Sequence, residues 1–345
     1  MLGVGVIGCG AISKMHIDSF LRIPQTKIRA VADVNEAAAR RTADKLDAES
    51  YTDYRELLKR SDIDIVSICT PSGLHSESAI AAAKAGKHVI VEKPLDVTLP
   101  KIDAMIEACG QNRVKLNCIF NNRYREGNLF LKHAIDAGRF GRLINANAII
   151  RWYREPDYYA KSPWHGSWAL DGGGALMNQS IHYVDLLLWL AGRVESLSAY
   201  TGTLLHKCME TEDTAVASLR FQNGALGAVI ATTSTYPGYP AEIQITGERG
   251  SASVLDGVID HWRFLDSDPL DQQAEAFFGT GEVDNARAST PMAFACEYHA
   301  RQISRAVESI ENDTEPDIGG VEARRSVELI LGIYESAKTG ARVSF

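Results

Sequence analysis

Short apolar runs in the first third of the chain alternate with segments whose apolar positions recur every three or four residues. The runs are typical of buried strands, and the three-and-four spacing is typical of amphipathic helices. The predicted strands are Leu2–Ile7, Lys27–Ala32, Ile63–Cys69, His88–Val91 and Val114–Phe120. The predicted helices between them are Ile12–Leu21, Glu36–Leu46, Tyr54–Lys59, Ser76–Ala85 and Pro100–Ala108. This alternation predicts an α/β fold with parallel βαβ units and a doubly wound parallel sheet.

The pattern changes after Phe120, where strand-like segments follow a helix predicted at Glu126–Ala137. The predicted strands are Arg142–Trp152, Val194–Leu205, Thr214–Phe221 and Ala225–Thr233. Asn223-Gly224 between the last two is typical of a two-residue hairpin turn, so these strands are expected to pair antiparallel. The second half is therefore predicted to be an α+β domain with one broad, mainly antiparallel sheet. Helices predicted to close the chain are Pro291–Ile310 and Val321–Ala337.

Composition and charge exclude several classes of protein. With 345 residues, of which 45% are hydrophobic and 23% charged, the chain can bury a large core and favours two domains. The net charge of -8 argues against a nucleic-acid partner, because phosphate binding needs clustered Lys and Arg. The sequence lacks a charged leader and an apolar stretch of membrane-spanning length, so we expect a cytoplasmic protein without a membrane partner. The six cysteines form no C-x-x-C pair, which predicts neither a metal site nor a disulfide scaffold.

A glycine turn, Gly8-Cys9-Gly10, lies between the first predicted strand and the first predicted helix. Gly8 permits the tight turn, Gly10 lets a pyrophosphate approach the main chain, and the helix amino end offers N–H groups to phosphates. Ser13 stands where a third glycine or an alanine is usual, which weakens the match to the dinucleotide fingerprint. The alternative is a glycine turn with a structural role only.

Asp33 comes directly after the second predicted strand. A carboxylate at this position can accept both ribose hydroxyls of a dinucleotide, and its charge would repel a 2′-phosphate. The sequence therefore predicts NAD as cofactor rather than NADP. The alternative for Asp33 is a solvated turn residue.

Two further motifs carry a resemblance to a known family. Glu92-Lys93-Pro94 follows the predicted strand His88–Val91, and the segment Gly172–Asp185 contains three glycines, Asn178 and His182. Together these motifs resemble the Gfo/Idh/MocA family of sugar oxidoreductases, over essentially the whole chain. The resemblance implies that Lys93 lies between nicotinamide and substrate, and that His182 faces it across the cleft.

The later motif also makes sense as a helix. Its apolar positions at core spacing are Met177, Ile181, Val184 and Leu188. Asn178, His182 and Asp185 fall together on another face, and a polar stripe of this kind needs a partner such as a cleft. Without the other motifs, His182 would be interpreted as a satisfied core histidine. We expect Asn178 to bind substrate, whereas Asp185 could either orient the His182 ring or have a structural role.

Oxidation of a sugar carbinol removes a hydride from carbon and a proton from the hydroxyl, so the site needs a base beside the nicotinamide. His182 can take that proton near neutral pH, whereas Lys93 would first need a lowered pKa. A charged Lys93 would instead stabilise the developing alkoxide. We therefore predict Lys93 and His182 as the catalytic residues, with His182 favoured as base and the reverse assignment open.

The remaining site residues follow from strand ends and from the resemblance. Glu92 could help to hold Lys93 or form a strand-end salt bridge, and His75 could equally be a surface residue. The predicted cofactor-binding residues are Gly8, Gly10, Ala11, Ile12, Asp33, Thr70, Pro71, His75, Glu92 and Lys93. The predicted substrate-binding residues are Lys93, Arg123, Tyr153, Trp164, Asn178 and His182.

The aromatic and basic residues around Arg123, Tyr153 and Trp164 resemble the nucleotide-sugar branch of the family, which includes UDP-N-acetylglucosaminuronate 3-dehydrogenase and sugar 3-ketoreductases. Aromatic faces can stack on a sugar or a base, and arginines can bind carboxylate or phosphate. The tryptophans could also be core residues.

We expect an NAD-dependent oxidoreductase that acts on a hydroxyl or ketone of a sugar, sugar acid or nucleotide sugar. The alternatives are a glycosidase that uses NAD for transient oxidation and a non-catalytic sugar or nucleotide sensor. A dinucleotide-binding Rossmann domain is predicted over residues 1–120, and a substrate and oligomerisation domain over 121–345, whose helix 321–337 could pack on the first domain. An exposed sheet face predicts a homodimer or homotetramer.

Overall fold

The computed structural model describes residues 1–162, 164–278 and 296–345. The chain divides into two compact units. Residues 1–121 and 296–324 form the first unit, and residues from 122 to 278, together with 325–345, form the second. The start of the helix predicted from Pro291 lies outside the described residues, and within them this helix is α11, Cys296–Glu311.

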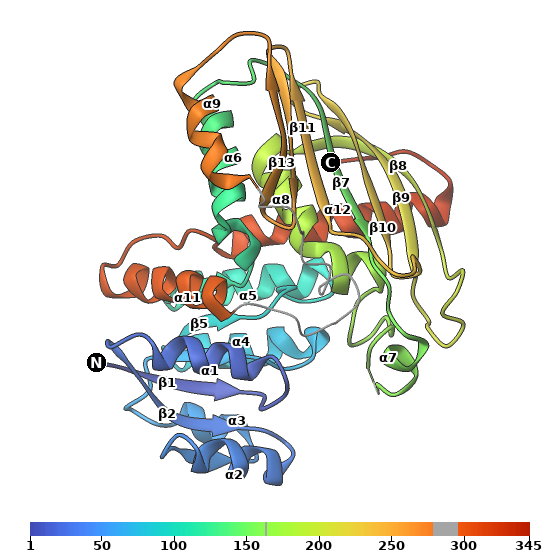
Figure 1. Cartoon of the computed structure of the whole chain (residues 1–345). Helices are drawn as coiled ribbons and strands as arrows, with labels where there is room; N and C mark the ends of the chain where they lie inside the picture. Colours follow the sequence, from blue (N-terminus) through green and yellow to red (C-terminus); the bar gives the residue numbers. More distant parts are fainter. Residues whose placement is uncertain (163, 279–295) are drawn as a thin grey trace. The chain divides into compact units, whose positions relative to one another are not determined.

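The first unit is built on a six-stranded sheet whose strands are all parallel (Figure 1). The strand order is β3-β2-β1-β4-β5-β6. The bounds are β1 Leu2–Ile7, β2 Thr26–Ala32, β3 Glu49–Tyr51, β4 Ile65–Ile68, β5 His88–Val91 and β6 Leu116–Cys118. The order reverses direction at β1, and in open parallel sheets ligands bind at such a switch point, beyond the carboxyl ends of the strands.

Helices lie on both faces of this sheet (Figure 1). Their bounds are α1 Ser13–Leu21, α2 Glu36–Asp44, α3 Tyr54–Leu58, α4 His75–Lys84 and α5 Leu99–Gln111. A short 3-10 turn, η1, spans Ser72–Leu74 before α4. Helix α11 belongs here because its apolar face is buried in the core of this unit, where Ile303 and Val307 share one cluster with Ile17 and Phe20 of α1.

The second unit is built on an eight-stranded sheet in the order β13-β12-β11-β7-β10-β9-β8-β14. The bounds are β7 Leu143–Arg151, β8 Val194–Gly202, β9 Thr214–Phe221, β10 Leu226–Thr232, β11 Glu242–Gly247, β12 Gly250–Leu255, β13 Val258–Phe264 and β14 Val343–Ser344. All neighbouring pairs are antiparallel except β7 and β10, which run parallel. The predicted α/β fold class, with a parallel sheet followed by a mainly antiparallel one, is confirmed.

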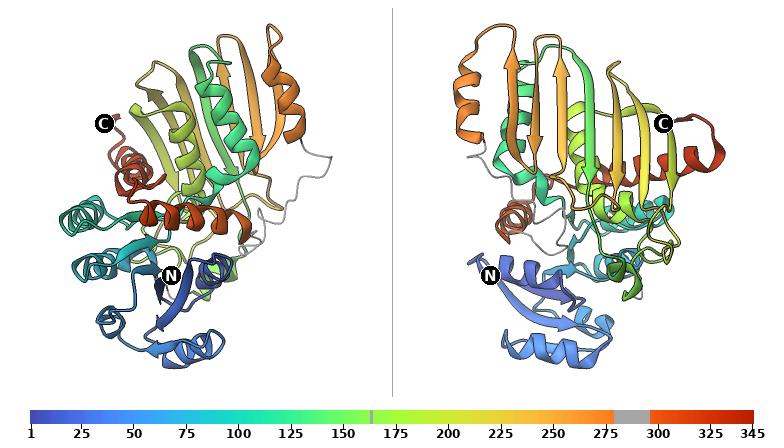
Figure 2. Two further views of the ribbon diagram at one scale, coloured as in Figure 1. Left: turned by 90° about the vertical axis from the view of Figure 1, so that its left-hand side faces the viewer. Right: turned by 45° about the vertical axis from the view of Figure 1, so that its right-hand side comes forward.

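Helices α6, Glu126–Asp136, and α8, Ile181–Ala191, lie against one face of this second sheet (Figure 2). The other helical segments are η2 Asn121–Tyr124, α7 Pro156–Ala160, η3 Ala175–Ser180, α9 Pro269–Ala274, η4 Glu275–Phe277 and α12 Gly320–Thr339. Helix α12 begins in the segment of the first unit and continues into that of the second. Among the described residues, every helix is too short or too polar to cross a membrane.

Candidate active site

The glycine turn follows β1 and leaves space at its tip. Gly8 has a φ of +93°, and a Cβ there would lie 2.7 Å from the main-chain carbon and oxygen of Cys69, so only glycine fits. A Cβ on Gly10 would meet no atom within 4 Å. Gly10 and Ala11 are exposed, and α1 begins directly afterwards at Ser13. The turn therefore has the open main chain and the helix amino end that a pyrophosphate requires.

Ser13 replaces the third small residue of the fingerprint without disturbing the turn. Its hydroxyl donates a hydrogen bond of 2.7 Å to the main-chain oxygen of Gly10. The side chain is buried, so it also lets α1 approach the sheet.

Asp33 lies next to the glycine turn. Its carboxylate accepts hydrogen bonds from the main-chain N–H of Cys9 at 2.7 Å and of Asn35 at 2.8 Å. The side chain is half-buried at the carboxyl end of β2. These two bonds orient the carboxylate beside the turn, and its contact with a ribose stays a prediction.

His75 connects two loops at the same edge of the sheet. The ring is buried, with Nδ1 2.7 Å from the main-chain oxygen of Pro94 and Nε2 2.9 Å from that of Thr70. Burial lowers the pKa of His75, although both carbonyl contacts act in the opposite direction. His75 is thus not a surface residue. Its contacts connect the Thr70-Pro71 loop after β4 to the turn after β5, and a direct contact with cofactor stays a prediction.

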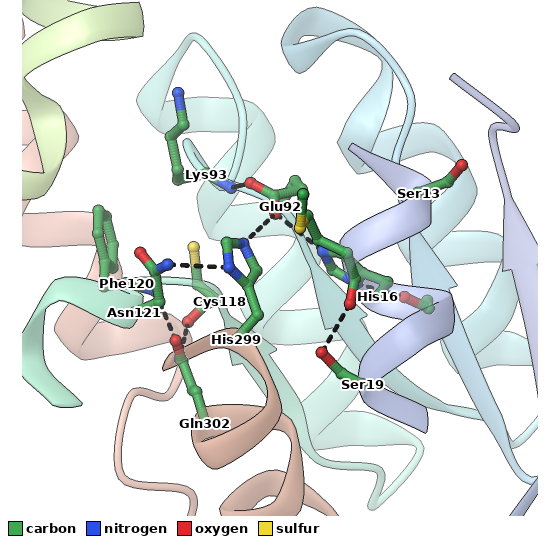
Figure 3. Close-up of polar contacts among 12 residues, drawn as sticks. Ser13, His16, Ser19, Glu92, Lys93, Cys118, Phe120, Asn121, His299 and Gln302 are labelled. Carbon is green, nitrogen blue, oxygen red and sulfur yellow. Dashed lines mark hydrogen bonds and ion pairs between the residues drawn. The ribbon is translucent and has the colours of Figure 1, made fainter. Parts of the chain in front are cut away.

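Glu92 and Lys93 follow the buried strand β5. The Glu92 carboxylate is buried, and its Oε2 accepts the main-chain N–H of Lys93 at 3.1 Å. Its Oε1 lies 2.8 Å from Nε2 of His16, a fully buried residue of α1. Figure 3 shows the Lys93 side chain extending away from this carboxylate. Glu92 therefore holds the main chain of the turn, and the Lys93 amine points elsewhere.

The charges around Glu92 are coupled. Although burial raises the pKa of Glu92, hydrogen bonds with His16 and His299 hold it well below its ordinary value. Burial likewise works against a charged His16, but contacts with Cys69 and Glu92 raise the pKa of His16 to about 10. Glu92 is therefore a carboxylate with an imidazolium beside it. His16, Glu92 and His299 are also the described residues whose donor atoms, all within 4.8 Å of one another, would suit a metal ion.

In the second unit, the motif that carries His182 is only partly α-helical. Residues Ala175–Ser180 form a π-helix, in which the Gln179 N–H contacts the Gly174 oxygen at 3.4 Å, and α8 begins at Ile181. The prediction of one regular helical face from Met177 to Leu188 is therefore wrong before Ile181, because a π-turn holds more residues than an α-turn. His182 lies in the first turn of α8 and is partly exposed.

Asn178 is held by its neighbours. Its Nδ2 donates to Oδ1 of the buried Asp171, and its Oδ1 accepts from Nε2 of Gln179 at 3.1 Å. Asp171 also accepts the N–H of Gly166 at 2.8 Å. Asp171 was not predicted from the sequence, although its place directly before three glycines was a signal. The neutral amide of Asn178 therefore lies next to the carboxylate of Asp171.

A second missed residue, Glu212, orders the glycine turn. Its carboxylate accepts the N–H of Gly174 at 3.1 Å, the N–H of Leu176 at 2.8 Å and the hydroxyl of Tyr334 at 3.0 Å. A Cβ on Gly173 would lie 2.0 Å from that hydroxyl, so glycine is required for this approach. Burial raises the pKa of Glu212 to about 7.

Arg123 and Asp185 form a buried ion pair. Nε and Nη2 of Arg123 donate to the two carboxylate oxygens of Asp185 at 2.7 and 2.6 Å. Ser326 adds a contact of 3.4 Å to Asp185. These bonds give Asp185 a structural role, and an effect of Asp185 on the His182 ring stays a prediction. A substrate contact by Arg123 stays a prediction beside this pairing.

The aromatic residues gather near the end of β7. The ring of His165 stacks on Tyr158 with centroids 4.5 Å apart and lies 4.0 Å from that of Trp164. Arg154 is buried beneath them, and its Nε donates to Gln179 at 3.0 Å. Tyr153 and Trp164 remain partly exposed, as substrate-binding residues must be, whereas Trp152 is buried core.

Family models match most of the chain. A model described as an oxidoreductase family with an NAD-binding Rossmann fold matches residues 2–120. A model described as the GFO/IDH/MocA C-terminal domain matches residues 129–253.

Named relatives agree with these models. Myo-inositol 2-dehydrogenase of Thermotoga maritima is 33% identical over 254 residues, which cover 72% of this chain and 73% of that protein. The WlbA dehydrogenase from Bordetella pertussis, crystallised with NADH and UDP-GlcNAcA, is 34% identical with a TM-score of 0.91, over 100% of this chain and 97% of that one. The WlbA dehydrogenase from Chromobacterium violaceum, in complex with the same two molecules, is 32% identical with a TM-score of 0.89, over 100% of this chain and 96% of that one.

Proposed function

We propose that this chain, which belongs to the Gfo/Idh/MocA family of NAD-binding oxidoreductases, transfers a hydride between NAD and a secondary hydroxyl or ketone of a nucleotide-linked sugar acid. The observation that carries this proposal is the gathering of the predicted residues at one sheet edge. The glycine turn, Asp33, Thr70 and Lys93 follow β1, β2, β4 and β5, which are neighbours in one parallel sheet. Parallel strands bring their carboxyl ends to a single edge, so nucleotide binding and chemistry are adjacent.

The glycine turn and Asp33 fit NAD. Gly10 leaves open space where a side chain would stand, and the Asp33 carboxylate is fixed beside the turn by the Cys9 N–H. Main-chain N–H groups at Ala11 and Ile12, at the amino end of α1, would bind the pyrophosphate, and Asp33 would accept the ribose hydroxyls. When bound, the nicotinamide supplies the hydride acceptor or donor.

Lys93 and His182 would have different roles at the reacting carbinol, one in charge stabilisation and the other in proton transfer. His182, partly exposed in the first turn of α8, would take the hydroxyl proton during oxidation and return it during reduction. The Lys93 ammonium would stabilise the negative charge that develops on the same oxygen. Both roles are part of this proposal. The pH profiles of kcat in Lys93→Met and His182→Ala decide which of the two residues accepts the proton.

The substrate class rests on two observations. Both WlbA dehydrogenases are crystallised with UDP-GlcNAcA, and the first is 34% identical to this chain over 97% of its length. Partly exposed Tyr153 and Trp164 offer aromatic faces that could stack on a sugar or base, and partly exposed Asn178 of the same unit offers a polar contact. We therefore favour a UDP-linked sugar acid over a free sugar or an inositol.

The test is a spectrophotometric assay at 340 nm after a check for bound nucleotide in the purified protein. NAD and NADP are each tried with UDP-sugar acids, UDP-sugars, free sugars, inositols and glycosides. We expect NAD reduction with a UDP-sugar acid. Turnover with free sugars or inositols alone would overturn the substrate class, and release of sugar from a glycoside without net NADH would overturn the function.

The homo-oligomer is proposed from the second sheet. One face of this sheet carries no helix among the described residues (Figure 2). On that face the strand register places Tyr200, Val216, Ile230 and Ile149 in one row across β8, β9, β10 and β7. Tyr200 is 82% exposed and Val216 46% exposed. An apolar row on a broad sheet of this kind favours burial against a second copy.

A further inference from the structure

Glu92 is held from two sides by histidines that are far apart in the sequence. Its Oε1 lies 2.8 Å from Nε2 of His16 in α1 and 3.5 Å from Nε2 of His299 in α11 (Figure 3). All three side chains are buried. The second carboxylate oxygen accepts the Lys93 N–H, so the carboxylate connects two helices to the main chain of the catalytic turn.

The contact of His299 with Asn121 determines which ring nitrogen of His299 carries the proton. Its Nδ1 lies 2.9 Å from Nδ2 of Asn121, which is a donor. We assign Nδ1 as the acceptor, so that Nε2 carries the proton and points at the carboxylate. The His16 ring also has a partner on its far side, because its Nδ1 lies 2.7 Å from the hydroxyl oxygen of Ser67. Both rings are therefore locked in orientation by a partner on the far side.

A second residue of α11 connects this helix to the sheet through hydrogen bonds. Gln302 is one turn after His299 and is buried. Its Oε1 accepts the N–H of Phe120 at 3.0 Å, and its Nε2 donates to the oxygen of Cys118 at 2.7 Å. This pair of bonds fixes α11 against the end of β6, so His299 approaches Glu92 from a rigid support.

The donor atoms of His16, Glu92 and His299 have the spacing of a metal site. Each Glu92 oxygen and each ring nitrogen already has a hydrogen-bond or ion-pair partner within the protein. A hydrogen-bonded network therefore accounts for the whole arrangement, and the buried carboxylate is satisfied by the two imidazoles.

We propose that His299 is a positioning residue for the hydride-transfer reaction, which acts through Glu92 to fix the main chain at Lys93. The effect on turnover rests on the proposed function, whereas the effect on the Lys93 main chain does not. His299 never touches the substrate in this account. Loss of its contact leaves the Glu92 carboxylate held by His16 alone, from one side. The turn is then looser and the Lys93 amine is misplaced, while the nucleotide site around Gly10 and Asp33 is retained.

Two substitutions at one position separate positioning from packing. In His299→Gln, the amide nitrogen can take the place of Nε2 and still donate to Glu92. In His299→Asn, the amide takes the place of Nδ1, which keeps the contact with Asn121 and loses that with Glu92. The matched control is His261→Asn, the same substitution at an exposed histidine of β13.

The first measurement is hydrogen–deuterium exchange at the Lys93 amide, resolved to the single residue by fragmentation mass spectrometry, which needs no substrate. We expect faster exchange in His299→Asn and nearly wild-type exchange in His299→Gln and His261→Asn. Equal exchange at Lys93 in all the proteins, or equal acceleration in both His299 variants, would overturn the inference.

The second measurement is turnover with the substrate found in the assay above. We expect kcat to fall about tenfold to a hundredfold in His299→Asn, with KM for NAD unchanged, because a small misplacement of a reacting group costs about that much. His299→Gln should recover most of the loss. Faster exchange without a lower kcat would contradict the positioning role. Absence of turnover in the wild type would instead count against the proposed function alone, and stoichiometric bound metal would overturn the inference.

Discussion

The carboxylate of Asp33 accepts the main-chain N–H of Cys9 at 2.7 Å, so the acidic residue after β2 is tied to the glycine turn after β1. The glycine turn and Asp33, which each indicate a dinucleotide site in the sequence, are therefore connected by a direct hydrogen bond. Since the same carboxylate also accepts the Asn35 N–H, its position is fixed before any ligand binds. Such preorganisation would lower the entropy cost of the ribose contact that we propose for Asp33.

Asp33→Asn should weaken the preference for NAD over NADP. The amide keeps one acceptor oxygen for the turn and removes the charge that would repel a 2′-phosphate. We expect the ratio of kcat/KM values for the two cofactors to shift toward NADP by about tenfold or more, which corresponds to about 1.4 kcal/mol. Asp18→Asn, at an exposed position of α1, is the control, and an unchanged ratio in Asp33→Asn would contradict the ribose role.

Asp185→Ala should strongly destabilise the second unit. It leaves the buried Arg123 guanidinium without the carboxylate that now accepts its two hydrogen bonds, and loss of one partner of a buried pair costs about 3–5 kcal/mol. Urea denaturation measures the free energy of unfolding. Glu297→Ala, which removes an exposed pair with Arg301, should cost less than about 1 kcal/mol.

Arg123→Met discriminates between the two roles of that arginine. If Arg123 is structural, this variant should be destabilised as strongly as Asp185→Ala. Lost substrate binding with unchanged stability would show instead that the arginine serves the substrate.

His16→Gln should change how stability depends on pH. Because the pKa of His16 is raised to about 10, its ion pair stabilises the fold fully below the ordinary value of 6.5 and loses this effect as pH rises through about 10. The groups that face His16 are Glu92, Cys69 and His299. The advantage of the wild type over His16→Gln should therefore shrink, on the order of 1–3 kcal/mol, between pH 6 and pH 10.5.

Thermal denaturation of both proteins across this range checks the prediction. A difference in stability that stays constant would mean that His16 is neutral throughout. A difference that grows with pH would contradict the assigned ion pair.

Val216→Arg should dissociate the oligomer. Val216 lies in the middle of the apolar row that we propose as the interface, and a buried unpaired charge there is costly. Light scattering coupled to size exclusion should show a multiple of the chain mass for the wild type and a smaller species for the variant. Val34→Arg, at a residue 94% exposed in the first unit, should leave the mass unchanged. A monomeric wild type would contradict the proposal.

The sequence predicts the elements with continuous or alternating apolar patterns well. β1, β5 and β9 have the predicted bounds, because each is an apolar or strictly alternating segment closed by a turn. The three-residue β3 was missed because it is an edge strand with polar, exposed residues at Glu49 and Ser50. Strands β11 to β13 were also missed, since their positions alternate with small and polar residues that carry little hydrophobic signal.

The site was predicted only as far as local motifs extend. Lys93 and the glycine turn are recognisable because each motif contains its own chemistry within a few residues. The partners of Glu92 are not, because His16 and His299 are 76 and 207 positions away and meet it only through the packing of α1 and α11. The π-helix before α8 was equally hidden, since its residues fit an α-helical pattern in the sequence.

The catalytic roles of Lys93 and His182 are tested most directly by the steady-state rate of NAD reduction at 340 nm in Lys93→Met and His182→Ala, with nucleotide affinity measured separately by titration. We expect each variant to fold and to lose about a hundredfold to ten-thousandfold in kcat. His182→Ala, at a residue outside the predicted nucleotide site, should bind NAD nearly as tightly as the wild type. His182→Ala should also change the pH profile of kcat, because it removes the proposed proton acceptor. Turnover that is unchanged in both variants would contradict the assignment of this chain's catalytic residues.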